Sequence, residues 1–270
     1  MDKASILGII LGIFAIVLGM ALKGVGMIAL LNPAAILIIL LGTVATILIS
    51  FPMRTIKKIP HLIKIVFTEE PQYDMNKIID TFATLANQIR KEGLLSLEKE
   101  IENQDDPFLK SGLQLILDGK SPEFIREFLI EKINAMEKRH REGAAIFSQA
   151  GTYAPTLGVL GAVVGLIAAL KNMEDMSVLG EAISAAFVAT LLGIFTGYVL
   201  WHPFANKLKE KSEREIQIKE IMVEGILSIT DGHSPRIVRE KLSTYLSEKE
   251  LLASREAFDE AEKQEPELSS

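Results

Sequence analysis

Residues 153–170 read YAPTLGVLGAVVGLIAAL, eighteen residues without a single charged side chain. Three more stretches share this character: residues 6–22, 33–51 and 182–201. At about 1.5 Å per residue, each is long enough to cross a hydrocarbon core of about 30 Å, although the first only just reaches that length. The sequence therefore predicts four membrane-spanning helices and excludes a single water-soluble enzyme.

The charged residues indicate the orientation of these spans. Lys, Arg, Asp and Glu make up 24% of the 270 residues, with a net charge of -6, and all of them lie outside the four stretches. Basic residues gather beside the spans on one side: Arg54, Lys57, Lys58 and Lys64; Lys138, Arg139 and Arg141; and Lys207, Lys209, Lys211 and Arg214. The two short connections on the other side contribute only Lys23 and Lys171.

Because cytoplasmic flanks are enriched in Lys and Arg, this bias places both termini and residues 52–150 in the cytoplasm. The expected location is the bacterial inner membrane, crossed several times. The basic rim suits anionic membrane lipid, and nucleic acid is not indicated as a partner.

The first span has an alternative interpretation as a cleaved signal peptide, because Gly19-Met20-Ala21 resembles a small-x-small cleavage site. Asp2 beside Lys3, and an apolar run longer than the usual 7 to 15 residues, favour a retained helix.

The charged segments are predicted to be helical. Asp106-Pro107 and Ser121-Pro122 each place a capping side chain before a proline, as does Ser234-Pro235. From Pro122 no breaker occurs before Gly143, so one helix is expected to run into the third span. An amphipathic pattern over residues 205–230 extends the fourth span.

The predicted fold is therefore an all-α membrane protein with a helical cytoplasmic domain between spans two and three. We expect four segments: transmembrane helices in 1–51, the cytoplasmic domain in 52–150, transmembrane helices in 151–204, and cytoplasmic helices in 205–270. The last segment ends in an acidic, partly disordered tail from residue 247.

No segment of the sequence meets the residue requirements of a known enzyme motif. Gly119-Lys120-Ser121 imitates the end of a phosphate-binding loop, but Gln114 stands where that loop needs glycine, and a helix end followed by a cap explains the same residues. The four histidines have no ligand spacing: His61, His140, His202 and His233. The sequence predicts no catalytic residue, metal site or cofactor.

Small residues recur at spacings of three and four within the spans, which lets helix backbones approach closely. These seams are Gly8, Gly12, Ala15 and Gly19 in the first span; Gly158, Gly161, Gly165 and Ala168 in the third; and Ala186, Thr190, Gly193 and Gly197 in the fourth. The second span carries Thr43, Thr46 and Ser50, whose hydroxyls either form a polar seam or bond back to a carbonyl one turn earlier.

None of the spans contains Asp, Glu, Lys, Arg or His. A protein that conducts ions normally has an ionisable residue within the membrane, so the titrating acid would have to come from another chain. Thr190, near mid-membrane, could line such a path. Pro155 and Pro203 lie towards the cytoplasmic ends of their spans, where proline either starts or stops a helix or creates a flexible joint.

Residues 155–165, PTLGVLGAVVG, resemble the glycine-rich third span of the superfamily that contains MotA, TolQ and ExbB. Three further features favour the MotA branch. They are the order of two spans, a domain of about 100 residues and two spans; VATLLG at 188–193 with HPFA at 202–205; and RKEGLLSLE at 90–98 with IEN at 101–103. The resemblance covers nearly all of the chain except the tail.

The resemblance implies an ion-conducting stator subunit of the bacterial flagellar motor. Five copies would surround two copies of MotB, which supplies the membrane aspartate, and ion flow would drive the cytoplasmic domains against the rotor protein FliG. On the family's pattern Arg90 and Glu98 engage FliG, Pro155 and Pro203 couple ion movement to shape change, and Thr190 lies beside the ion path. Without the resemblance, Arg90 and Glu98 would be interpreted as an ordinary solvated face.

Two other functions stay open from the sequence. One is an energiser of the TolQ or ExbB type, which usually has three spans. The other is a non-conducting membrane scaffold. The sequence does not distinguish H⁺ from Na⁺ as the coupling ion, and H⁺ is favoured only as the commoner of the two.

Overall fold

The computed structural model describes residues 2–69, 74–171, 175–246 and 251, and within these ranges the regular structure is entirely helical. The elements are α1 (Lys3–Leu22), η1 (Met27–Leu30), α2 (Pro33–Ser50), α3 (Met53–Ile56), α4 (Ile59–Phe67), α5 (Met75–Glu92), η2 (Leu94–Ser96), α6 (Leu97–Asn103), α7 (Pro107–Leu117), α8 (Pro122–Leu170), α9 (Met176–Phe195), η3 (Thr196–Trp201), α10 (His202–Thr230) and α11 (Pro235–Ser243). The prediction of an all-α fold is confirmed.

Four of the described helical segments are long and apolar enough to cross a membrane. They are α1, the segment that ends with α2, the C-terminal part of α8, and the segment that begins with α9. Side-chain caps begin three of them, because Asp2, Asn32 and Asp175 each accept hydrogen bonds from backbone N–H groups of the first turn. The predicted spans therefore match helices of the structure, and a capping residue directly before the helix begins three of them.

The chain divides into two compact units. The first comprises Met1–Glu70 and Lys138–Ser212, and the second comprises Pro71–Glu137 and Glu213–Ser270. Both α8 and α10 contribute to the two units, because each continues from one into the other without a break. Residues 52–70, which follow the second span, belong to the first unit together with the four spans.

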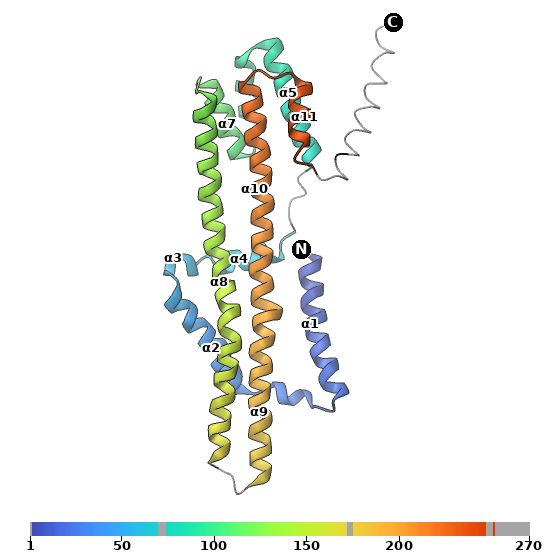
Figure 1. The fold of residues 1–270 in the computed structure, drawn as a ribbon, viewed down its shortest axis with the longest axis vertical. Coiled ribbons are helices and arrows are strands. Elements are labelled where there is room, and N and C mark those ends of the chain that lie inside the picture. Colours follow the sequence, from blue (N-terminus) through green and yellow to red (C-terminus); the bar gives the residue numbers. More distant parts are fainter. Residues whose placement is uncertain (1, 70–73, 172–174, 247–250, 252–270) are drawn as a thin grey trace. The chain divides into compact units, whose positions relative to one another are not determined.

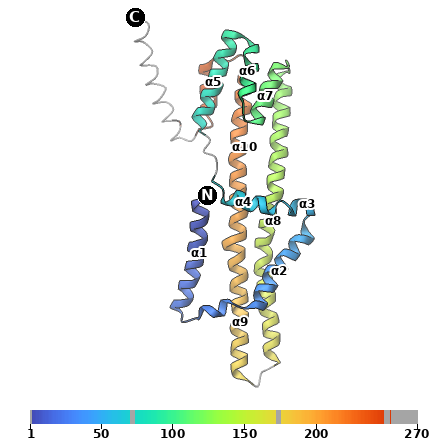
Figure 2. The same cartoon turned by 180° about the vertical axis from the view of Figure 1, so that it is seen from behind.

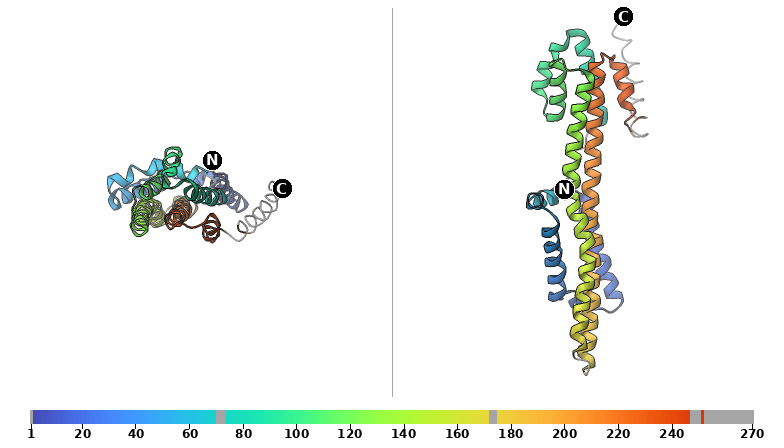
Figure 3. Two further views of the ribbon diagram at one scale, coloured as in Figure 1. Left: turned by 90° about the horizontal axis from the view of Figure 1, so that it is seen from above. Right: turned by 60° about the vertical axis from the view of Figure 1, so that its left-hand side comes forward.

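In the first unit, α8 and α9 lie side by side (Figure 1, Figure 3). The other spans pack on this pair: α2 contacts α9, and Gly42 of α2 lies against the Leu157 side chain of α8. Next to the spans, a cluster of buried side chains joins α4, α8 and α10 and consists of Val66, Ala144, Phe147, Ala205 and Leu208.

The second unit has a soluble-type hydrophobic core. Its centre includes Phe82 of α5, Leu113 of α7, Leu129 of α8 and Ile226 of α10, all fully buried. The Phe82 ring packs directly on the backbone of α10, because a Cβ on Gly225 would lie 2.6 Å from that ring. The helix α11 packs along α5 (Figure 2).

Local sequence signals in the second unit match the structure. Asp106 caps α7 by accepting from the N–H groups of Phe108 and Leu109, and the Ser121 hydroxyl accepts from Phe124 at the start of α8. Ser234 caps α11. Apart from residue 251, the acidic tail from residue 247 lies outside the described residues.

Candidate functional site

The backbones of α8 and α9 are in direct contact at Gly158 and Gly193. A Cβ on Gly193 would lie 2.7 Å from the Ala154 carbonyl oxygen and 2.8 Å from the Gly158 Cα. A Cβ on Gly158 would in turn lie 2.8 Å from the Ala189 carbonyl oxygen. Because backbone atoms surround both positions, only glycine allows the two helices to approach this closely.

Farther along the same pair the contact becomes ordinary. A Cβ on Gly161 would lie 3.5 Å from the Ala189 Cβ, and one on Gly165 would lie 3.7 Å from the Ala186 Cβ. In α1 only Gly12 has a close neighbour, the Val199 side chain, whereas Gly8 and Gly19 have open space around them. The small-residue seam is therefore tightest near the start of the third span, in α8, and the end of the fourth span, in η3.

The hydroxyl groups of the second span mostly bond within their own helix. Thr43 donates to the Ile39 carbonyl and Thr46 to the Thr43 carbonyl, at 2.6 and 2.8 Å. Ser50 differs, because its hydroxyl lies 3.3 Å from the Tyr153 hydroxyl of α8. Of the two interpretations left open by the sequence, the bond to a preceding carbonyl describes the two threonines, and a contact between helices describes Ser50.

Pro155 lies inside α8, so it neither starts nor stops a helix. Proline has no N–H, and the Gly151 carbonyl four residues earlier therefore loses its helical donor. A Cβ on Gly197 would lie 2.8 Å from that carbonyl oxygen and 2.8 Å from the Pro155 ring. Gly197 thus faces the weakened turn of α8, where its Cα–H can approach the freed carbonyl.

Span four contains a π-helical segment opposite this turn, η3, which joins α9 to α10. In a π-helix each carbonyl accepts from the N–H five residues along the chain, and at the end of η3 the His202 N–H donates to the Gly197 carbonyl, one residue before Pro203. The helix continues through Pro203 into α10. Both prolines therefore mark irregular turns within continuous helices, and the Pro155 turn contacts Gly197 of η3.

His202 occupies the same level as these irregular turns. Its ring lies against Gly151, where a Cβ would be 2.7 Å from ring atoms, and the Tyr198 ring lies 5.3 Å away. Thr190 lies in α9, about two helical turns before Gly197. It donates its hydroxyl to the Ala186 carbonyl at 3.2 Å and is partly exposed.

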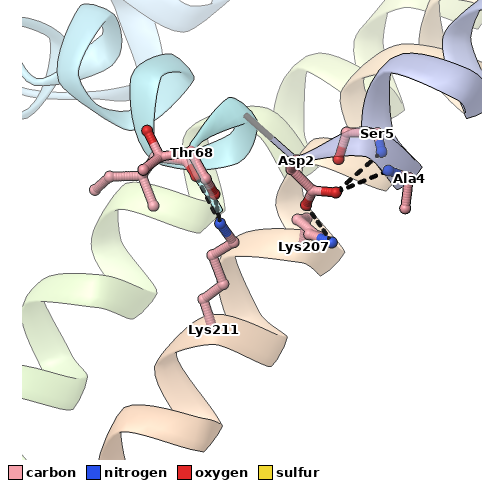
Figure 4. A network of polar contacts seen from close by, with 7 residues as sticks. Asp2, Ala4, Ser5, Thr68, Lys207 and Lys211 are labelled. Carbon is pink, nitrogen blue, oxygen red and sulfur yellow. Dashed lines mark hydrogen bonds and ion pairs between the residues drawn. The ribbon is translucent and has the colours of Figure 1, made fainter. Parts of the chain in front are cut away.

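A polar network that sequence reasoning missed ties down the start of α1 (Figure 4). Lys207 of α10 pairs with the Asp2 carboxylate at 2.5 Å, and the Asp2 N–H donates to the Phe67 carbonyl at the end of α4. Hydrogen bonding to Lys207 lowers the pKa of Asp2 to about 2. Lys211 donates to the carbonyls of Ile65 and Thr68, at 2.8 and 2.5 Å, and so caps α4.

Arg90 and Glu98 both lie on the surface of the second unit. Arg90 is in the last turn of α5, which ends at Gly93 with a φ of +81°. Glu98 is in the first turn of α6. The break at Gly93 means that the two charges lie on two different helices, α5 and α6.

The second unit also contains a largely buried ion pair. Lys219 of α10 donates to the Asp106 carboxylate at 2.6 Å, and its ammonium group lies 5.2 Å from the centre of the Phe108 ring. Burial raises the pKa of Asp106, but the Lys219 contact and two backbone N–H groups outweigh that effect and hold the pKa below its usual value.

The segment that imitates a phosphate loop is a helix end. Gly119 adopts a φ of +69° after α7, and Ser121 then caps α8. No cluster of three or more metal-ligating side chains occurs among the residues that the structure describes.

Comparisons with known proteins agree with this geometry. Residues 100–221 match the model of the MotA/TolQ/ExbB proton channel family. Motility protein A of Bacillus subtilis is 57% identical over 252 residues, which cover 93% of each chain. The chain belongs to the MotA/TolQ/ExbB proton channel family.

Two solved structures extend this family likeness to three dimensions. The flagellar MotAB stator complex from Bacillus subtilis contains a chain with a TM-score of 0.89 and 57% identity, with coverage of 93% of this chain and 99% of that one. For C. jejuni MotAB the TM-score is 0.86 and the identity 31%, with coverage of 92% and 97%. This member of the family is therefore a multi-pass membrane protein with the fold of those chains.

Proposed function

We propose that the chain is the ion-conducting membrane subunit of a flagellar stator and turns ion flow into torque. The observation that carries this proposal is the likeness to the flagellar MotAB stator complex along almost the whole chain. The four apolar helices favour this function over an energiser of the TolQ or ExbB type, for which three spans are expected.

The composition of the spans supports a complex in which a second kind of subunit supplies the group that binds the ion. They contain no residue that could bind a proton by itself, because Asp, Glu, Lys, Arg and His are missing from all four charge-free stretches. We therefore assign the ion-binding acid to a MotB-like partner. We propose a ring of five copies around two MotB helices, in the inner membrane with both termini in the cytoplasm. The coupling ion is proposed to be H⁺.

We assign the coupling of ion movement to conformational change to the irregular turns of α8 and η3. Thr190 is assigned to the lining of the ion path. The Pro155 ring and the Gly151 carbonyl both lie directly against Gly197, so a change in the conformation of either turn displaces the other helix. Pro203 lies next to the π-helical segment, a feature that often marks functional positions within helices. The contact therefore provides a mechanical route from the spans into α8 and α10.

Arg90 and Glu98 are assigned to the contact with the rotor protein FliG. An exposed ion pair contributes about 0.2–1 kcal/mol, so neutralising either charge should weaken motility only in part. Reversal replaces attraction with repulsion, and Arg90→Glu should therefore impair swimming more than Arg90→Ala. Lys77→Glu, in the first turn of the same helix, is the matched control and should swim normally.

The test measures swimming of a deletion strain that carries each variant, together with proton uptake on co-expression with the aspartate-bearing partner. Arg90→Glu should stop rotation while membrane localisation, partner association and conductance persist, and a compensating charge reversal on FliG should restore some swimming. Loss of accumulation or assembly would make Arg90 a structural residue. Normal swimming of the deletion strain, or no conductance with any partner, would instead favour a membrane scaffold.

A further inference from the structure

The two short helices after α2 carry a row of basic side chains. Between residues 52 and 68 there is no acidic residue, but there are five basic ones: Arg54, Lys57, Lys58, His61 and Lys64. All five are exposed. Within the described part of the chain none of them has an ion-pair partner. This surface, which we term the α3–α4 basic row, is thus a concentration of uncompensated positive charge.

The opposite side of α4 is fixed to the protein. Val66 is fully buried in the cluster that contains Phe147 and Leu208, and Leu62 and Ile63 pack against the same cluster. Leu62 also fills the space beside Gly143, where a Cβ would lie 3.0 Å from its side chain. The apolar face of α4 is therefore occupied, and the helix does not need to insert that face into lipid.

Both ends of this segment are tied to the ends of membrane spans. It begins directly after α2, and at its other end the Phe67 carbonyl accepts the N–H of Asp2 at 2.9 Å, where α1 begins. Lys211 holds the last turn of α4 from α10 (Figure 4). Because the ends of two spans mark the edge of the hydrocarbon core, α4 must run along the membrane surface, and it crosses the direction of α1 in both opposite views (Figure 1, Figure 2).

We propose that the α3–α4 basic row binds the headgroups of anionic phospholipids in the leaflet at which α1 begins. The charge is complementary to lipid phosphate, the depth is that of the headgroups, and Ile49 and Met53 beside the row expose apolar surface, 86% and 56%, that acyl chains can cover. Each Lys or Arg near an anionic surface strengthens attraction about fivefold. The proposal depends on the membrane topology and on the charge of the row, and it is independent of motor function.

The test uses the full-length chain, purified in detergent with equal amounts of phosphatidylglycerol and phosphatidylcholine and then washed. Retained lipid is measured by mass spectrometry. The wild-type chain should retain phosphatidylglycerol over phosphatidylcholine by about fivefold or more. In Lys57→Gln/Lys58→Gln/Lys64→Gln this ratio should fall towards one, whereas Lys57→Arg/Lys58→Arg/Lys64→Arg should keep it.

The matched control is Lys77→Gln/Lys99→Gln/Lys110→Gln, which removes three exposed lysines of the second unit and should retain the wild-type ratio. Equal retention of the two lipids by the wild-type chain would overturn the proposal. An unchanged ratio in the first triple variant would also overturn it, as would the same loss in the control. Displacement of phosphatidylglycerol by millimolar inorganic phosphate would show a site for free anions and not for lipid.

Discussion

Replacement of Gly193 by alanine tests the backbone contact between α8 and α9. The added Cβ would lie 2.7 Å from the Ala154 carbonyl oxygen and 2.8 Å from the Gly158 Cα. Ordinary contacts between such atoms need about 3.5 Å, so the two helices must separate by about 0.7 Å. A gap of that size forfeits a quarter to a half of the dispersion energy of the atoms along the seam, and overpacking of this kind costs about 1–3 kcal/mol.

Gly180→Ala is the matched control, because Gly180 lies in the same helix with no neighbour within 4 Å. Alanine is favoured over glycine within a helix by about 0.5–1 kcal/mol at both positions, so this gain cancels in the comparison. The difference between the two variants should therefore be about 2 kcal/mol, or about 4–8 °C in Tm. Thermal unfolding of the detergent-solubilised chain, followed by far-UV circular dichroism, measures it.

Equal Tm values for Gly193→Ala and Gly180→Ala would refute the close packing of α8 on α9. The larger change Gly193→Leu should abolish swimming and so should Gly161→Leu, whereas Leu200→Ile should be tolerated. If Gly193→Leu left swimming and partner association intact, the seam would face lipid.

Three further predictions concern topology, the buried ion pair and the ion path. An impermeant reagent applied outside the cell should label Lys171→Cys but not Glu102→Cys or Glu213→Cys; the reverse pattern would refute the proposed orientation. Asp106→Asn keeps the α7 cap but leaves the ammonium group of Lys219 unpaired, so at pH 7 it should lower the free energy of unfolding by about 2 kcal/mol in urea titrations. Because the folded-state pKa of Asp106 is depressed, this contribution is present above the unfolded pKa of about 4 and should disappear as the pH falls below it. Thr190→Val should reduce swimming speed less than loss of the partner's acid, since its hydroxyl already bonds to Ala186.

Features that depend on neighbouring residues could be predicted from the sequence. The four spans follow from charge-free length, and the caps at Asp106, Ser121 and Ser234 follow from a side chain placed before proline. The uninterrupted pattern after Pro122 predicted the long helix α8 for the same reason. In each case the physical cause lies within a few residues of its effect.

Features that depend on distant pairing could not be predicted. Asp2 and Lys207 were each interpretable by themselves, one as a charge at the head of the first span and one as part of the basic rim, but nothing local pairs residues so far apart. The small-residue spacing of α1 likewise did not reveal that Gly12 has a helix beside it and that Gly8 and Gly19 do not. The spacing of small residues identifies which face of a helix they share, but it does not identify which other helix packs on that face.

The π-helical segment of span four shows how the two kinds of information combine. The sequence left open whether Pro155 and Pro203 start or stop a helix or create a flexible joint, and both helices continue through them. The Gly151 carbonyl faces Gly197 and leaves no room for a side chain there, while Pro203 follows the π-helical segment by two residues. The missing N–H of Pro155 thus lies at a turn of α8 that contacts η3 of the other helix. A change in the α8 turn must therefore alter its contact with η3, which is the property that coupling between the two helices requires.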